Sequence, residues 1–162
     1  MMLSNSPLAA NEQSRNLADF LILESRERGD LVTPLKLQKL MFYSDAWFMA
    51  LYDEELTTEK FQAWVHGPVA LSQYHRFKDN RWRPIMDEIE MPDFDKRAAN
   101  HLDEILDVFG PETGPALEMM THSERPWIKA RAGIPDGEPC NTYISKKITK
   151  KFYASLAENK EK

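Results

Sequence analysis

The sequence contains one cysteine, six glycines and no long hydrophobic run. Because Cys140 has no second cysteine to pair with, an internal disulfide is excluded and a reducing compartment is expected. No stretch approaches the roughly 18 consecutive apolar residues that a membrane span needs, and the first residues lack the charged and apolar regions of a signal peptide. We therefore expect a cytoplasmic protein that does not bind a membrane.

Common catalytic and metal-binding spacings are also absent. No two histidines are three or four residues apart, so no helix can present a two-histidine metal site; the four are His66, His75, His101 and His122. No glycine-rich loop has a phosphate-binding spacing. We therefore expect no catalytic residue, no metal ion and no cofactor. The alternative is a small hydrolase or transferase in which Cys140 is the nucleophile and His122 or His101 is the base.

Charge is unevenly distributed along the chain. Residues 145–162 hold six lysines and two glutamates, a net charge of +4, whereas residues 1–144 have a net charge of −9. An acidic body disfavours general nucleic-acid binding, which needs a basic face, and suits a basic protein partner. A solvated acidic surface without a partner explains the same composition. A DNA-binding regulator that uses the basic segment Lys146–Lys151 is the remaining alternative.

A buried helix is predicted over Pro34–Tyr52. Thr33 can accept hydrogen bonds from the first free backbone N–H groups, and Pro34 fits the first helical position because it has no N–H to leave unpaired. At about 100° per residue, apolar side chains cover nearly the whole circumference of this helix. Since a helix that is apolar all round belongs inside a domain, we expect the other elements to pack around it.

The remaining segments predict a mainly α fold. We expect helices at Ser14–Arg28, Val69–Lys78, Asp95–Phe109 and Pro115–Thr121, and two more that are capped by Ser123 and Ser145. Loops are expected at Asp79–Asp95 and Gly133–Pro139, with one or two short strands between Leu56 and Val65.

This segmentation predicts a single compact helical domain over residues 13–157. The domain is expected to form around the buried central helix, with a minor short β element; an all-α fold is the alternative. Residues 1–12 are expected to be a flexible N-terminal arm, and residues 158–162 a charged C-terminal tail.

Two polar stripes run along the predicted central helix. Gln38 and Asp45 lie on one, and Lys36, Lys39 and Tyr43 lie on the other. Buried polar groups need partners, so two explanations are open. One stripe can reach the rim of a binding groove. Alternatively, Gln38 satisfies backbone groups of neighbouring loops, and Lys36 pairs with an acidic residue at the edge of the domain.

The segment from Trp64 to Pro68 also has two explanations. Gly67 permits a positive φ and Pro68 can start the next helix, which would make this turn purely architectural. Alternatively, His66 beside Trp64 forms part of a recognition surface, as aromatic residues and their polar neighbours do at interface centres. Trp127 is expected in the core, with an interface role as its alternative.

Together these motifs resemble one known family. They are the run Lys36–Ser44, the pattern Phe61-x-Ala63-Trp64, the turn His66–Val69 and the later Pro126-Trp127. In order and spacing they are similar to the Panacea-domain family, earlier named phage-associated GepA-like proteins, which includes the SocA-like antitoxins. The resemblance extends from about residue 14 to residue 155. It implies a bacterial or prophage antitoxin that neutralises a partner toxin by direct binding.

The resemblance also implies a partner and a binding surface. We expect a cognate protein toxin encoded by a neighbouring gene, whose identity stays open because family members are paired with unrelated toxins; nucleic acid is not expected. The expected surface includes Lys36, Lys39, Tyr43, Trp64 and His66. It would bind through a buried aromatic anchor with a polar rim and block or restrain the toxin. Delivery of the toxin to a protease, as the SocA-like resemblance implies, is a further alternative.

Overall fold

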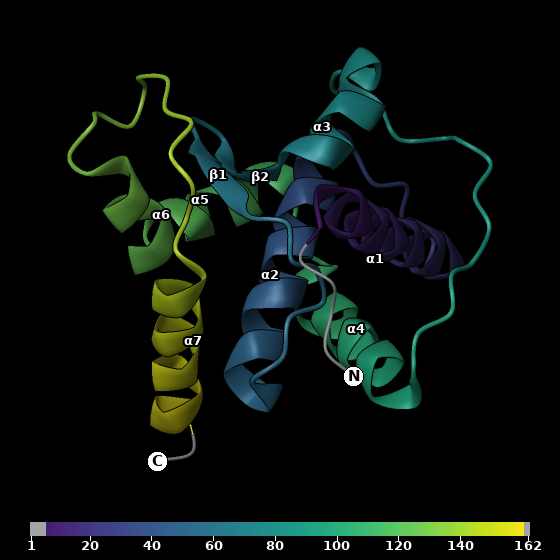
Figure 1. Ribbon diagram of the computed structural model, residues 1–162. Coiled ribbons are helices and arrows are strands. Elements are labelled where there is room, and N and C mark those ends of the chain that lie inside the picture. The colour runs from purple at the N-terminus through teal and green to yellow at the C-terminus, as the bar shows by residue number, and fades with distance from the viewer. Residues whose placement is uncertain (1–5, 161–162) are drawn as a thin grey trace.

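The protein folds around one central helix, with a small β hairpin beside the first turns of that helix (Figure 1). The computed structural model describes residues 6–160. Its elements in chain order are α1 (Pro7–Glu27), α2 (Pro34–Tyr52), β1 (Phe61–Trp64), β2 (Gly67–Ala70), α3 (Leu71–Phe77), the 3₁₀ turn η1 (Lys78–Asn80), α4 (Lys96–Phe109), α5 (Gly114–His122), α6 (Arg125–Arg131) and α7 (Lys146–Lys160). The predicted mainly α fold with a minor β element is confirmed, and the all-α alternative is wrong. Within residues 6–160 no helix combines the length and apolar character needed to cross a bilayer.

Helix α2 lies at the centre and begins and ends where the sequence predicts. The Thr33 side chain accepts a hydrogen bond from the backbone N of Lys36 at 3.2 Å, and Asp53 ends the helix in the left-handed conformation with φ 58°. Leu40 and Tyr43 are fully buried. Helices α1, α4, α5 and α7 pack around α2 (Figure 1). The prediction of a buried central helix is confirmed.

Helix α1 is longer than predicted, because it starts at Pro7 and not at Ser14. Ser6 caps it by accepting a backbone N–H at 3.2 Å, and Pro7 occupies the first turn. Ser6 and Pro7 therefore form the same start signal as the one that opens α2. The prediction of a flexible arm is wrong for residues 7–12, which are helical. Residues 1–5 of that arm lie outside the described residues.

Of the two helix caps predicted near the C-terminus, one is present and one is not. Ser145 caps α7, as predicted, by accepting the backbone N–H of Ile148 at 3.1 Å. This helix continues to Lys160, so it includes most of the predicted charged tail; residues 161 and 162 lie outside the described part. Ser123 does not cap α6. Its hydroxyl donates to the carbonyl of Met120 at 2.8 Å, and the residue ends α5 instead.

Strands β1 and β2 form an antiparallel hairpin with Val65 and His66 in the turn. The predicted strand is confirmed at β1. The prediction that a helix begins at Val69, with Pro68 opening it, is wrong: both residues lie in β2, and α3 begins at Leu71. A strand forms here in place of the predicted helix because contacts with α2 hold β2 in the extended conformation.

Pro68 is compatible with this strand because of its position in the ladder. It lies opposite Ala63, which directs its N–H to the carbonyl of Thr142 at 2.9 Å and its carbonyl to Arg131 at 2.9 Å. Ala63 therefore exchanges no hydrogen bond with β2, and the N–H that proline lacks is not needed there. The same contacts hold the chain around Thr142 along the outer edge of β1.

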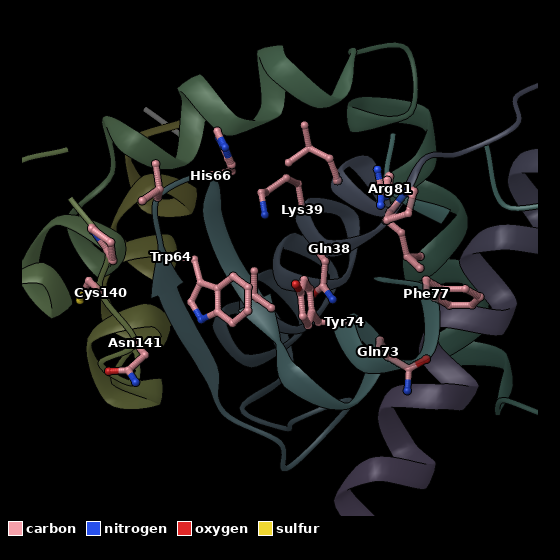
Figure 2. Close-up of a pocket in the computed structure, with 16 residues that line it drawn as sticks. Gln38, Lys39, Trp64, His66, Gln73, Tyr74, Phe77, Arg81, Cys140 and Asn141 are labelled. Atoms are coloured by element: carbon pink, nitrogen blue, oxygen red, sulfur yellow. The ribbon is translucent and has the colours of Figure 1, made fainter. Parts of the chain in front are cut away.

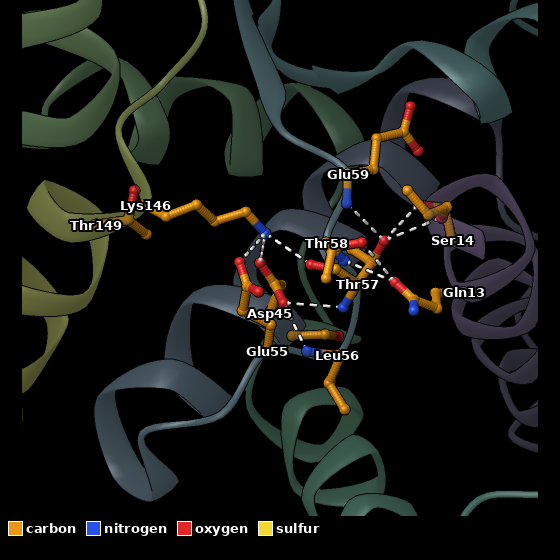
Figure 3. Close-up of polar contacts among 12 residues, drawn as sticks. Gln13, Ser14, Asp45, Glu55, Leu56, Thr57, Thr58, Glu59, Lys146 and Thr149 are labelled. Carbon is orange, nitrogen blue, oxygen red and sulfur yellow. Dashed lines mark hydrogen bonds and ion pairs between the residues drawn. The ribbon is translucent and has the colours of Figure 1, made fainter. Parts of the chain in front are cut away.

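A buried polar network joins α1, α2, α7 and the segment before β1 (Figure 3). The Asp45 carboxylate accepts backbone N–H groups of Leu56 at 2.8 Å and Thr57 at 3.2 Å, and binds the amine of Lys146 at 2.5 Å. Lys146 also donates to the carbonyl of Thr57 at 2.8 Å. The hydroxyls of Thr57 and Ser14 lie 2.8 Å apart. The network therefore fixes the start of α7 against the central helix.

Candidate functional site

A pocket of about 690 Å³ opens between α2, the hairpin, α3 and the loop of residues 139–141 (Figure 2). Its walls are mainly apolar and include Leu35, Leu37, Val69 and Phe77. Polar side chains reach it at a few positions only. A concave and mainly apolar site of several hundred cubic ångströms, with a few placed polar groups, is the general form of a binding site.

Two aromatic side chains form one wall of the pocket. The rings of Trp64 and Tyr74 meet edge to face, with centroids 4.6 Å apart. Trp64 donates its indole N–H to the side-chain oxygen of Gln62 at 2.7 Å, which fixes the orientation of the indole. Trp64 is half-buried and Tyr74 is 37% exposed. This wall is therefore ordered before any ligand arrives and keeps apolar surface accessible to one.

Lys39 lies at the floor of the pocket. Its side chain is 1% exposed, and its amine donates to the carbonyl of Pro68 at 2.8 Å. Burial lowers the pKa of Lys39 from 10.5 to about 7, although the charge of Glu118 acts in the opposite direction. In Figure 2 the amine nitrogen points into the ring of lining side chains. The pocket therefore has a titratable amine in a largely desolvated position.

Gly67 makes room for the Lys39 side chain. A Cβ atom at this glycine would lie 2.6 Å from Cε of Lys39 and 2.9 Å from the hydroxyl oxygen of Thr121. Its φ of 105° also lies in a region that favours glycine. The predicted positive φ at Gly67 is confirmed, and the glycine serves a second purpose that the sequence does not reveal.

Gln38 and Lys36 use their polar groups inside the fold. The Gln38 side chain accepts the N–H of Ala70 at 2.8 Å and donates to the carbonyl of the same residue at 3.1 Å, as a neighbouring strand would. Lys36 binds the carboxylate of Asp30 and the carbonyl of Gly110, each at 2.6 Å. These contacts confirm the structural alternative for both residues. Together with Lys39, which binds the carbonyl of Pro68, Gln38 occupies the edge of β2 that does not pair with β1.

The five residues predicted to bind a partner do not form one surface. Lys39, Trp64 and His66 line the pocket together, and the His66 side chain is 74% exposed at its rim. Lys36 lies elsewhere on α2, beside Asp30. Tyr43 is fully buried. The structure therefore brings three of the five together and leaves Lys36 and Tyr43 out; binding of a partner by the three stays a prediction.

Tyr43 belongs to an interior cluster centred on Glu124. The Glu124 carboxylate accepts hydrogen bonds from the hydroxyls of Tyr43 at 2.5 Å and Tyr153 at 2.9 Å. The ring of Tyr43 stacks on Phe109 with centroids 4.4 Å apart. Burial raises the pKa of Glu124, while the two tyrosine hydrogen bonds act to lower it. The cluster joins α2, α4, α6 and α7 and is part of the core.

Arg131 shapes the pocket indirectly and was not predicted from the sequence. Trp127 is buried, as predicted, and donates its indole N–H to the carbonyl of Trp64 at 2.8 Å. The guanidinium of Arg131 lies 4.7 Å from the centre of the Trp127 ring and donates to the carbonyls of Ala63 and Pro135. It also donates to the carbonyl of Glu138. Arg131 thus positions the loop that leads into the pocket wall. The sequence did contain a signal for Arg131: it is a basic residue one turn after Trp127 and just before a glycine-containing loop.

The sequence alternative of a catalytic cysteine depends on a histidine near Cys140. The pKa of the Cys140 thiol is lowered: burial alone would raise it, but hydrogen bonds with Thr142 and the charge of Arg131 outweigh burial. His101 lies against the carbonyl of Ser44 at 2.9 Å, and no described hydrogen bond joins Cys140 to a histidine. In the part of the chain that the structure describes, no three His, Cys, Asp or Glu side chains gather to hold a metal ion.

The basic segment at the start of α7 is partly neutralised within the protein. Lys146 pairs with Asp45, and Lys150 pairs with Asp53. A nucleic-acid interface needs basic side chains that are available to phosphates. These two ion pairs reduce the positive charge that the segment can offer to DNA.

A helical domain with a preformed, mainly apolar pocket is able to bind a ligand or a partner segment there. The family model described as antitoxin SocA-like, Panacea domain, matches residues 37–128, which is more than half of the chain. The chain therefore belongs to this antitoxin family, and membership implies a cognate toxin as partner. The match is narrower than the resemblance seen in the sequence, and it includes α2 from Leu37 onward, the hairpin and Trp127. No curated protein and no solved structure matches the chain.

Proposed function

We propose that this protein neutralises a cognate protein toxin by direct binding, and that the pocket beside the hairpin is the centre of the interface. Family membership supports the antitoxin role. The observation that carries the location is the aromatic pair, half-buried Trp64 and partly exposed Tyr74, in a concave apolar site within the matched region. Aromatic side chains at the centre of a desolvated patch contribute most of the binding energy in protein interfaces.

Polar groups around this pair suit the rim of an interface. His66 and Arg81 line the pocket, and both residues are exposed. His66 lies 3.1 Å from a carboxylate oxygen of Glu118, which limits the orientations of its ring. A polar rim excludes water from the central contacts and gives specificity. The toxin is expected to insert an apolar side chain between the aromatic wall and α2.

Occlusion or restraint of the bound toxin is the proposed mechanism, in the cytoplasm and with the toxin encoded by a neighbouring gene. Delivery to a protease would have a different signature. Under occlusion the half-life of the toxin in cells stays unchanged or rises when the antitoxin is co-expressed. Under delivery it falls, and deletion of the protease abolishes rescue. Immunoblotting after translation is stopped separates the two mechanisms.

The test uses matched aromatic substitutions. The product of the adjacent reading frame is co-expressed with the wild-type protein or with Trp64→Ala or Tyr74→Ala, and growth and co-purification are measured. The controls are Trp82→Ala and Tyr143→Ala, since these side chains are 75% and 56% exposed and do not line the pocket. We expect each pocket variant to weaken binding at least about tenfold and each control to change it less than about twofold.

Thermal unfolding of every variant comes first, so that loss of fold is not mistaken for loss of contact. Folded pocket variants that still rescue growth and bind the toxin like the controls would place the interface elsewhere. Failure of the wild-type protein to bind or to rescue would reject the antitoxin function toward that partner.

A further inference from the structure

The pocket has a charge opposite to that of the whole protein. The chain carries a net charge of −5, yet none of the aspartates or glutamates between residues 6 and 160 lines the pocket. Its charged lining groups are Lys39 at the floor and Arg81 at the rim. Desolvated walls strengthen the attraction between such groups and an incoming anion. The pocket is therefore suited to a ligand that combines an apolar part with a negative charge.

Lys39 differs from the other inward-facing lysines of this fold. Lys36 has the carboxylate of Asp30 at 2.6 Å, and Lys146 has that of Asp45 at 2.5 Å. Within residues 6–160 no carboxylate lies within ion-pair distance of Lys39, whose one described acceptor is the carbonyl of Pro68. Glu118 acts on this amine only from beyond ion-pair distance, and burial outweighs its effect. A buried amine without a direct ion-pair partner is incompletely compensated, so a carboxylate supplied by a partner would stabilise its charged form.

Arg81, an exposed residue that lines the pocket, has an uncommon backbone conformation. Its φ is 57° and its ψ is −115°, a combination that residues with a Cβ rarely adopt. In Figure 2, Lys39 and Arg81 lie above the aromatic pair Trp64 and Tyr74. Cationic groups and an apolar wall therefore face the same space from different elements.

We propose that the pocket receives an acidic residue of the toxin, with its carboxylate against Lys39 and Arg81 and a neighbouring apolar side chain of the toxin against Trp64 and Tyr74. The proposal rests on the proposed function, because the toxin supplies the residue. The opposite charge and the mainly apolar walls favour a carboxylate in a protein segment over a polyanion such as nucleic acid, which the acidic body repels.

The first experiment tests the chemistry of the pocket without a toxin. The purified protein is titrated with 3-phenylpropanoate and with its neutral amide, 3-phenylpropanamide, while the indole N–H signal of Trp64 is followed by NMR. We expect the carboxylate to bind with a Kd at least about tenfold lower than the amide. Lys39→Met should remove this preference. Lys129→Met, which changes an exposed lysine outside the pocket, should preserve it.

The second experiment uses the toxin itself. Arg81→Gln changes an exposed residue and does not put folding at risk, so it complements Lys39→Met. Each should weaken toxin binding at least about tenfold. Replacement of each toxin Asp or Glu by its amide should identify one carboxylate whose loss is non-additive with Arg81→Gln.

The outcomes separate this proposal from the proposed function. Equal affinities for the two probes, together with unchanged toxin binding by both variants, overturn the acidic-residue proposal and leave the antitoxin function intact. Loss of toxin binding in Trp64→Ala but not in Arg81→Gln or Lys39→Met overturns it in the same way. No binding of the toxin by the wild-type protein overturns both proposals.

Discussion

Gly67 and Lys39, from two separate sequence motifs, occupy adjoining space: a Cβ on the glycine would lie 2.6 Å from Cε of the lysine. With a larger residue at this position, the Lys39 side chain or the hairpin would have to shift. Since Lys39 also holds the carbonyl of Pro68, the two motifs together fix the hairpin on the central helix. The floor of the pocket is a consequence of this contact.

Gly67→Ala should destabilise the fold. The new methyl group would meet the buried Lys39 side chain, and the residue would keep a φ near 105° that alanine disfavours. Together these effects are expected to lower the free energy of unfolding by about 3 kcal/mol. Urea unfolding followed by circular dichroism measures it. Gly137→Ala is the control, because nothing lies within 4 Å of a Cβ at that position. Equal stability of the two variants would contradict the steric account.

Asp45→Asn should destabilise the protein much more than Asp53→Asn. Asp45 is buried and serves Lys146 together with two backbone N–H groups, whereas the side chains of Asp53 and Lys150 are 79% and 43% exposed. We expect a loss of about 2–3 kcal/mol for the buried pair and less than about 1 kcal/mol for the exposed pair. Thermal and urea unfolding compare the two variants directly. A similar small loss for both would show that the buried network does not hold α7 in place.

The fold was predictable where the signal is local. The Thr33-Pro34 start and the apolar circumference define α2 completely, because capping and periodicity both act within a few residues. The hairpin was only half predicted. Pro68 and Val69 carry no local sign of a second strand, since the groups that hold it extended come from Gln38 and Lys39 on another element.

The candidate site follows the same division. Lys39, Trp64 and His66 were singled out from motifs, and they do line one pocket. Tyr74 and Arg81 were not predicted as site residues, because only the folded hairpin and α3 bring them to the pocket. Periodicity also shows which residues share a face of α2 but not what covers that face, which explains why Tyr43 was wrongly expected near the surface.

Glu124→Gln should remove a pH dependence of stability. Burial raises the pKa of Glu124 above its ordinary value of 4.5, so in the window above 4.5 the folded state binds more protons than the unfolded chain. Glu124 therefore makes its full contribution to the stability of the wild-type protein below pH 4.5. This contribution is lost as the pH rises through the folded pKa. Glutamine cannot titrate, and it can still accept a hydrogen bond from Tyr43 or Tyr153.

The measurement is urea unfolding of both proteins in steps from pH 4 to pH 7.5. The wild-type protein should lose stability relative to Glu124→Gln as pH rises. A constant difference between the two proteins would mean that Glu124 has the same pKa in the folded and unfolded states.

Lys39→Met should reveal a pH dependence of the opposite sign. The folded pKa of Lys39, about 7, lies below the ordinary 10.5, so between these values the unfolded chain binds more protons than the folded one. The wild-type protein should therefore gain stability relative to the methionine variant as pH rises through this window, by at most about 1.4 kcal/mol per pH unit. Methionine fills a similar volume without a charge.

Glu118, which favours the charged amine, and the rings of His66 and His122 are the other ionisable groups around this position. Burial lowers the pKa of His122 from its ordinary 6.5, which moves it away from the window. Unfolding of both proteins at pH 7, 8 and 9 isolates the contribution of the lysine.

If a bound toxin supplies the missing carboxylate, the complex should keep Lys39 charged and take up a proton on binding at pH 8. Calorimetry in two buffers of different ionisation enthalpy detects that proton, and its absence alongside tight binding would mean that no anion reaches the floor of the pocket.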